Sequence, residues 1–238
     1  MIYLAPENKS SLGEDTFWTW FNREIPSTFQ VDSASPGDWV LQYATLGPRP
    51  GKTVALLWEL YAEMKKYGVG SDDFKINRMR ACYEDSPYKT VSSKSQLEFY
   101  PGSTILPIGV DTDLFNSNKK EHDGLVGFWC GTDHPMKGKD RLLKYASEHP
   151  EIKWNIVNKS ECLPQTRLAQ LMNESDFILL TGRLRPYFMV EWEAMACDLD
   201  CVDVSGMERD FIPNGRQGVF DQGWSRNQAK EEWLRFLS

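Results

Sequence analysis

The stretch that says most about the fold of this 238-residue chain reads Glu191-Trp192-Glu193-Ala194-Met195-Ala196-Cys197-Asp198. Two other fragments precede it, and they read Ile108-Gly109-Val110-Asp111-Thr112-Asp113-Leu114-Phe115 and Gly131-Thr132-Asp133-His134-Pro135-Met136-Lys137-Gly138. Each fragment alone is a weak signal. Their occurrence in this order, with an apolar strand pattern after the last of them, is a strong one.

Together the fragments resemble the nucleotide-sugar-binding half of retaining glycosyltransferases of the GT-B fold, specifically the group 1 or family 4 type. That family reads, in order, an I-P-N-G-V-D-x-x-x-F linker, a G-R-x-x-x-K-G loop, and a Glu separated by seven residues from E-A-M-A-x-G. The resemblance is close over residues 104–210 and extends to the first lobe only in architecture. The compactness of the chain is similar to that of phage-encoded members, although no motif supports this likeness.

Strand-like and helix-like patterns alternate along the chain, which predicts an α/β fold with parallel sheets. We expect two Rossmann-like lobes, an acceptor-side lobe at residues 1–111 and a nucleotide-sugar lobe at residues 112–238. The resemblance implies that a C-terminal helix, expected at residues 225–237, crosses back to the first lobe. The other expected strands are residues 1–5, 28–31, 39–43, 53–58, 89–92, 125–130, 154–157, 177–180 and 201–204. Residues 104–108 are expected to lead into the linker between the lobes. The other expected helices are residues 15–25, 61–67, 77–83, 140–148, 163–173 and 190–196.

The composition sets limits on partners and location. A net charge of −7 argues against a whole-protein attraction to nucleic acid. The longest apolar run, at residues 53–57, is too short to span a bilayer. The N-terminal residues show no signal-peptide pattern. An odd count of cysteines without paired spacing indicates reduced thiols. We therefore expect a cytoplasmic protein (host cytoplasm if viral), without a membrane partner, as a monomer or small homo-oligomer. The cysteines are Cys82, Cys130, Cys162, Cys197 and Cys201.

The loop at Lys137-Gly138 lies where a leaving diphosphate needs a cation. A cation and the start of a helix both stabilise the negative charge that grows as the glycosidic bond breaks. The resemblance implies that Lys137 contacts the diphosphate and that Gly138 allows the tight turn. Thr132 stands where the family has Arg, so Arg183 or Arg185 is expected to supply the second cation; the alternative is that both pair with surface acids.

Glu193 matches the second Glu of the family motif, and the resemblance implies that it accepts hydrogen bonds from the ribose hydroxyls of the donor nucleotide. The first Glu of that motif, which contacts the donor sugar in the family, is replaced by Arg185. Glu191 is two residues from Glu193, and helical geometry is expected to point it away from the cleft. Asp198 stands where the family has Gly.

Other candidate residues follow from position alone. Tyr187 and Phe188 stand where the family has a glycine-rich turn that holds sugar hydroxyls, which implies a reshaped pocket. Gly13 follows the first expected strand and is a candidate for the donor phosphates. Glu59, next to Trp58, is a candidate general base if the reaction inverts; the alternative is an ordinary acid at a helix start.

The sequence thus predicts a hexosyltransferase-type enzyme that moves a sugar from a nucleoside-diphosphate sugar, with UDP as the guessed nucleotide, to an acceptor hydroxyl. The resemblance implies retention and independence of metal, and no other cofactor is expected. One expected acceptor is a hydroxymethylated pyrimidine in DNA, with a stripe of basic side chains in the first lobe as a candidate contact for the DNA phosphates. The alternative for this stripe is a solvated helix face. The alternatives are a small-molecule or polysaccharide acceptor, or a non-catalytic nucleotide-sugar-binding protein. The basic residues are Lys65, Lys66, Lys75, Arg78 and Arg80.

Overall fold

The structure, a computed structural model, describes residues 2–4, 28–30, 39–43, 52–57, 61–70, 72–158, 161, 163–185, 188–209 and 215–238. They form two compact units. Unit 1 comprises Met1–Ile108 together with Ala229–Ser238, and unit 2 comprises Gly109–Gln228. The last helix, α8 (Arg226–Leu237), therefore begins in unit 2 and ends in unit 1. The helix expected at residues 15–25 lies outside the described residues.

Unit 1 contains a six-stranded sheet in the order β2-β1-β3-β4-β5-β6, in which every pairing is parallel. The order places β1 in the interior of the sheet, so the chain crosses over repeatedly, as in Rossmann-like folds. The strands are β1 (Ile2–Leu4), β2 (Thr28–Gln30), β3 (Trp39–Tyr43), β4 (Lys52–Leu56), β5 (Tyr88–Val91) and β6 (Thr104–Ile105).

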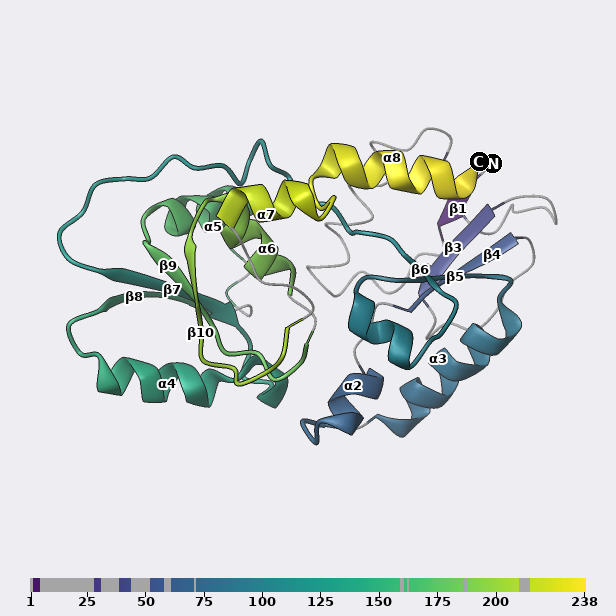
Figure 1. Ribbon diagram of the computed structural model, residues 1–238, viewed down its shortest axis with the longest axis horizontal. Helices are drawn as coiled ribbons and strands as arrows, with labels where there is room; N and C mark the ends of the chain where they lie inside the picture. Colours follow the sequence, from purple (N-terminus) through teal and green to yellow (C-terminus); the bar gives the residue numbers. More distant parts are fainter. Residues whose placement is uncertain are drawn as a thin grey trace. The chain divides into compact units, whose positions relative to one another are not determined.

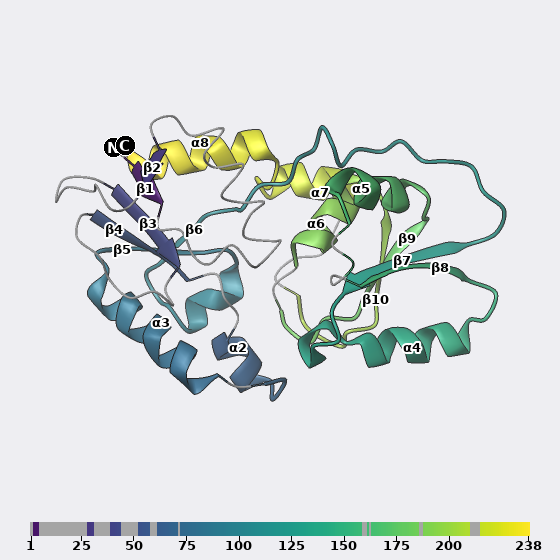
Figure 2. The same ribbon diagram turned by 180° about the vertical axis from the view of Figure 1, so that it is seen from behind.

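Helices α2 (Tyr61–Lys66) and α3 (Asp73–Asp85) lie on one side of this sheet and α8 on the other (Figures 1 and 2). Helix α3 starts four residues before the expected one because Asp72 caps it and accepts a hydrogen bond from the Lys75 amide. Its buried face packs with residues of β4 and β5 and with the segment after the short 3₁₀ helix η3 (Lys94–Glu98). That core comprises Ala55, Leu57, Met79, Cys82, Val91 and Tyr100.

The C-terminal helix is anchored in unit 1 through one aromatic side chain. Trp233 is fully buried, and its Nε1 donates a hydrogen bond of 3.1 Å to the carbonyl oxygen of Pro107. Phe236, one turn on, meets the ring of Tyr88 edge to face at a centroid distance of 6.3 Å. The expected crossing of this helix from the second lobe to the first is therefore confirmed by its packing.

Unit 2 contains a four-stranded parallel sheet in the order β10-β9-β7-β8. All four strands overlap those expected from the sequence. They are β7 (Val126–Gly131), β8 (Lys153–Asn158), β9 (Phe177–Leu180) and β10 (Asp200–Asp203). Helix α4 covers one face of the sheet, and helices α5, α6 and α7 cover the other (Figures 1 and 2). The helices are α4 (Lys139–Glu148), α5 (Gln165–Asn173), α6 (Met189–Ala196) and α7 (Gly215–Asp221).

Side chains that alternate along the strands build two cores in unit 2. Phe128 and Ile178 face the core beneath α5, α6 and α7, whereas their neighbours Trp129 and Phe177 face Leu142 of α4. A strand buried on both faces is read in the sequence as a continuous apolar run, which is why β9 is entirely apolar.

The linker between the units is fixed to unit 2 by main-chain and side-chain hydrogen bonds. Val110 pairs with the segment before α8, with its amide 2.7 Å from the carbonyl oxygen of Trp224. Asp111 accepts hydrogen bonds from the amides of Asp113 and Leu114 and forms an ion pair with Arg226. Asp111 therefore shapes the start of the linker.

The four described cysteines, Cys82, Cys130, Cys197 and Cys201, are free thiols. Burial raises the pKa of Cys197 to about 12 and that of Cys201 to about 12. Both thiols are therefore held in the protonated, unreactive form near neutral pH. Among the described residues, no helix is both long and apolar enough to cross a membrane.

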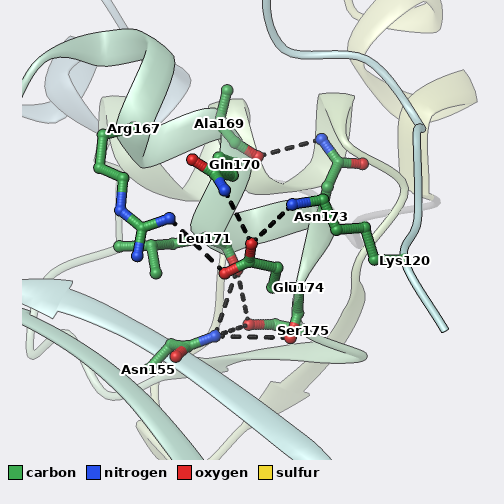
Figure 3. Close-up of polar contacts among 9 residues, drawn as sticks. All are labelled: Lys120, Asn155, Arg167, Ala169, Gln170, Leu171, Asn173, Glu174 and Ser175. Carbon is green, nitrogen blue, oxygen red and sulfur yellow. Dashed lines mark hydrogen bonds and ion pairs between the residues drawn. The ribbon is translucent and has the colours of Figure 1, made fainter. Parts of the chain in front are cut away.

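The carboxyl end of α5 carries a polar network centred on Glu174 (Figure 3). Its carboxylate accepts hydrogen bonds from Lys120 Nζ at 2.8 Å and Gln170 Nε2 at 2.9 Å, and Arg167 lies 3.7 Å away. The hydrogen bond from Lys120 is the main cause that lowers the pKa of Glu174 below its usual range near 4.5.

This network predicts a pH dependence of stability. Because the pKa of Glu174 is lower in the folded chain than in the unfolded chain, its stabilising contribution is present above the unfolded pKa and is lost as the pH falls through the folded pKa. We expect Glu174→Gln to be less stable than the wild type at pH 7 and to approach it below pH 4. Urea unfolding of both proteins across this range measures the difference; a gap that stays constant with pH would exclude this role.

Candidate functional site

The loop between β7 and α4 adopts a conformation that only glycine accommodates at its end. Pro135–Lys137 form the short 3₁₀ helix η4, and Gly138 follows in the left-handed region with φ of 66°. A Cβ atom at Gly138 would lie 2.1 Å from the carbonyl oxygen of Thr181. The glycine therefore lets the loop approach the end of β9 closely, and α4 begins directly after it.

Two predicted site residues, Lys137 and Phe188, meet in unit 2. Lys137 Nζ lies 3.1 Å from the centroid of the Phe188 ring, a cation–π contact. The ring itself fits against the bare Cα of Gly182, where a Cβ would come within 2.8 Å of it. The Phe188 ring thus holds the Lys137 ammonium at the carboxyl end of β9.

Further cations surround the carboxyl end of β9. The Arg183 amide donates to the carbonyl oxygen of Met136 at 2.9 Å, and its guanidinium pairs with Asp140 at 2.5 Å. Arg141 donates to the carbonyl oxygen of Thr181 at 3.2 Å. Burial, and then the nearby charge of Arg183, lower the pKa of Arg141. This edge of the sheet is therefore rich in positive charge.

Arg209, which follows β10, joins this group. Its side chain is only 5% exposed; it donates to the carbonyl oxygen of Leu184 at 2.9 Å and pairs with Asp203 at 3.2 Å. One of its terminal nitrogens also lies beside Gly182. The sequence interpretation missed Arg141 and Arg209. The signal that could have found Arg209 is its place just after a parallel strand, where side chains of neighbouring strands converge.

The two glutamates of α6 are both buried. Glu193 is 8% exposed and lies in the second turn of the helix, not at its start, and its charge helps to raise the pKa of Cys197. Glu191 is 5% exposed and accepts a hydrogen bond from the Phe188 amide at 2.9 Å. Burial raises the pKa of Glu191, and the charges of Arg209 and Lys137 oppose that shift.

The expectation that Glu191 points away from the site is therefore wrong. Glu191 is the third residue of α6, and its carboxylate turns back to cap the helix start beside Phe188. This turn places the carboxylate near the Lys137 and Arg209 cations. Helical periodicity alone places a side chain on a face and does not foresee a capping contact.

Two other predicted residues make local contacts. Thr132 has no cationic group, and its hydroxyl accepts a hydrogen bond from the His134 amide at 3.3 Å. Arg185 Nε donates to the carbonyl oxygen of Glu208 at 3.3 Å. Arg183 pairs with the exposed acid Asp140, which is the alternative that the sequence analysis left open for it. It still lies next to the Lys137 loop. Gly13, Glu59 with its neighbour Trp58, and Tyr187 lie outside the described residues.

The backbone conformation at Asp198 explains why the family has glycine at this position. It follows the end of α6 and has φ of 62°, the one positive value among the described non-glycine residues. The Asp198 amide donates to the carbonyl oxygen of Met195 at 2.9 Å and the Leu199 amide to that of Ala194 at 3.2 Å. These two bonds are the Schellman motif, which requires a left-handed residue.

Substitutions at Asp198 should separate this backbone requirement from side-chain contacts. We expect Asp198→Val to lower the free energy of unfolding by about 2 kcal/mol, because a β-branched residue is strained in the left-handed region. We expect Asp198→Gly to stay within about 1 kcal/mol of the wild type, since relief of strain and greater unfolded-chain entropy oppose each other. Urea unfolding measures both; equal stability of the Val and Gly variants would contradict the assignment.

Three of the five basic side chains considered for DNA lie next to acids. Lys65 lies 2.6 Å from Asp73, Lys66 lies 2.5 Å from Glu98, and Lys75 lies 3.8 Å from Asp72. Phosphate binding by these lysines would have to displace those carboxylates. The described residues hold no group of three or more His, Cys, Asp or Glu side chains suited to a metal ion.

No protein-family model matches the chain, and a search of curated proteins finds no significant match. Several solved structures are similar to it. Sucrose-phosphate synthase from Thermosynechococcus elongatus is 16% identical with a TM-score of 0.53, over 84% of this chain and 69% of that one. TarM is 10% identical with a TM-score of 0.61, over 93% and 57%. AviGT4, a glycosyltransferase involved in avilamycin A biosynthesis, is 10% identical with a TM-score of 0.59, over 99% and 96%.

These similarities establish the fold. The structural neighbours are GT-B glycosyltransferases, and the two parallel α/β units of this chain match the Rossmann-like lobes of that fold. The chain spans 57% of the length of TarM and 96% of that of AviGT4. The expected fold class is confirmed.

Proposed function

We propose that this protein is a glycosyltransferase that transfers a sugar from a nucleoside-diphosphate sugar to an acceptor hydroxyl. The observation that carries the proposal is the set of cations at the carboxyl end of β9, where Lys137, Arg183 and Arg141 lie around the Gly138 turn and the first turn of α4. Open parallel sheets bind ligands at this edge, and the start of a helix favours anions.

In this proposal Lys137 and Arg183 face the diphosphate. The leaving diphosphate gains negative charge as the bond to the sugar breaks, so a fixed cation binds the transition state more tightly than the ground state. Arg183 takes the part of the Arg that Thr132 replaces. The Arg183 side chain is 30% exposed, and its guanidinium lies beside the first turn of α4 through its pair with Asp140.

In this proposal the Glu193 carboxylate accepts hydrogen bonds from the two ribose hydroxyls. A carboxylate has two oxygens and matches a vicinal diol. A TarM variant from S. aureus has been solved in complex with UDP, fondaparinux and α-GlcNAc-glycerol, which supports UDP as the nucleotide to test first. The displaced phosphate takes the acceptor proton, the sugar keeps its configuration, and the protein cations replace a metal.

The acceptor we propose is a hydroxyl of a small molecule or polysaccharide. The support for this choice is the pairing of Lys65, Lys66 and Lys75 with acids, which leaves fewer cations for DNA phosphates. A hydroxymethylated pyrimidine in DNA is the second acceptor to test.

The test is product analysis by mass spectrometry. UDP- and GDP-sugars are incubated with the protein and with sugars, a polysaccharide or hydroxymethylpyrimidine DNA. We expect one sugar residue to be added to a sugar or polysaccharide hydroxyl, and NMR of the product to show the anomeric configuration of the donor. Addition to DNA would redirect the acceptor, and an inverted anomer would overturn the retaining mechanism. Nucleotide binding without any product would identify a non-catalytic binding protein.

A further inference from the structure

The hydroxyl of Thr181 connects the end of β9 with strand β7 and with the loop that follows β7. Thr181 follows β9, and Trp129 lies in β7, which pairs with β9. Trp129 Nε1 donates to Thr181 Oγ1 at 2.9 Å, and Thr181 Oγ1 donates to the carbonyl oxygen of Lys137 at 2.6 Å. Both Trp129 and Thr181 are buried, at 3% and 2% exposed.

Chemistry fixes the direction of this relay. An indole N–H only donates, so Thr181 Oγ1 must accept from Trp129. The single hydroxyl proton is then left for the carbonyl oxygen of Lys137. Serine at position 181 preserves both bonds, whereas valine, which has nearly the same shape, removes both and leaves a buried donor and a part-buried acceptor without these partners.

The contacts on either side of Lys137 strengthen the connection. The Arg183 amide donates to the carbonyl oxygen of Met136, and the Cα of Gly138 packs against the carbonyl oxygen of Thr181. Three consecutive loop residues, 136 to 138, are therefore held by residues 181 to 183. Of these three contacts, the hydrogen bond from the Thr181 hydroxyl is the one made to Lys137.

We infer that Thr181 is a positioning residue that sets the Lys137 ammonium for the diphosphate, an assignment that rests on the proposed function. The main chain of Lys137 is fixed by Thr181, and its Nζ is placed over the Phe188 ring. Without the hydroxyl, the Lys137 carbonyl loses its anchor and the ammonium moves relative to the leaving group. Displacements of about 1 Å in a catalytic group can cost about 100-fold in rate.

The kinetic test uses Thr181→Val, Thr181→Ser, and the same changes in a Lys137→Met background. We expect Thr181→Val to lower kcat about 10- to 100-fold with little change in KM for the donor, and Thr181→Ser to retain most of the activity. In the Lys137→Met background Thr181→Val should have no further effect, because the residue acts through Lys137. A wild-type kcat for Thr181→Val, or an equal loss in both backgrounds, would overturn the inference. Should the valine variant not fold, Thr181→Cys, whose thiol donates only weakly, replaces it.

A second readout needs no turnover and so separates this inference from the proposed function. Reductive ¹³C-methylation of the lysines gives one NMR signal per side chain, and the Lys137 signal, assigned by its loss in Lys137→Arg, should be shifted by the ring current of Phe188. We expect Thr181→Val to move it toward the position of exposed lysines and Thr181→Ser to leave it in place. An unmoved signal in Thr181→Val refutes positioning even if the enzyme is active. A moved signal supports positioning even if no transfer is ever detected.

Discussion

Replacement of Lys137 by methionine should abolish nearly all sugar transfer while leaving nucleotide binding largely intact. Methionine is close to lysine in length and can still contact the Phe188 ring, but it has no charge to offer the leaving diphosphate. Removing one preorganised group that stabilises developing charge costs about 100- to 1,000-fold in kcat. Because the ammonium acts mainly as the charge develops, KM should change much less than kcat.

The matched control for this variant is Lys139→Met. Lys139 lies on the other side of Gly138, is partly exposed, and pairs with the exposed Asp133 at 2.5 Å. The Lys139→Met substitution removes one positive charge from the same region and leaves the contact between Lys137 and the Phe188 ring in place. Steady-state kinetics should show a near-normal kcat for this control. Equal losses in the two variants would mean that general charge, and not the placement of Lys137, supports turnover.

Replacement of Glu193 by glutamine should weaken UDP binding about 10- to 100-fold. Hydrogen bonds to a charged group contribute about 1.5–3 kcal/mol, and about 1.4 kcal/mol corresponds to a tenfold change in Kd. Glutamine keeps the size of the buried side chain but offers a single acceptor oxygen to the ribose diol. Calorimetric titration with UDP measures the change.

Two comparisons make the Glu193 result specific. Glu148→Gln removes the same charge from the exposed carboxyl end of α4 and should bind UDP normally. Pyrophosphate, which has no ribose, should bind Glu193→Gln as well as it binds the wild type. If pyrophosphate and UDP lost affinity to the same degree, Glu193 would be acting on the phosphate end or on the fold, and the ribose assignment would be wrong.

Much of the fold could be predicted from the sequence because its signals are local. The apolar run of β9 and the pattern of β7 reach the core on both faces of the sheet, and such strands are read directly as hydrophobic segments. Helix α7 was not predicted, because its seven residues show little periodicity. The second lobe was expected to hold roughly five strand–helix repeats, whereas the sheet of its described residues has four strands.

The site was only partly predictable because its contacts join segments distant in the sequence. Lys137 and Phe188 were recognised from position, but their cation–π contact depends on the pairing of β7 with β9. Arg209 was missed because its place after β10 gains meaning only once β10 is known to lie beside β9. Glu191 was misjudged because a capping contact overrode the helical face.

The measurement that tests the central claim most directly is nucleotide release by the purified protein. Wild-type protein and Lys137→Met are compared with UDP-sugars in the presence and absence of an acceptor identified by mass spectrometry. We expect the wild type to release UDP in an acceptor-dependent way and Lys137→Met to release it about 100- to 1,000-fold more slowly. Release that is equally fast in both proteins, or no release from any donor by the wild type, would contradict the central claim.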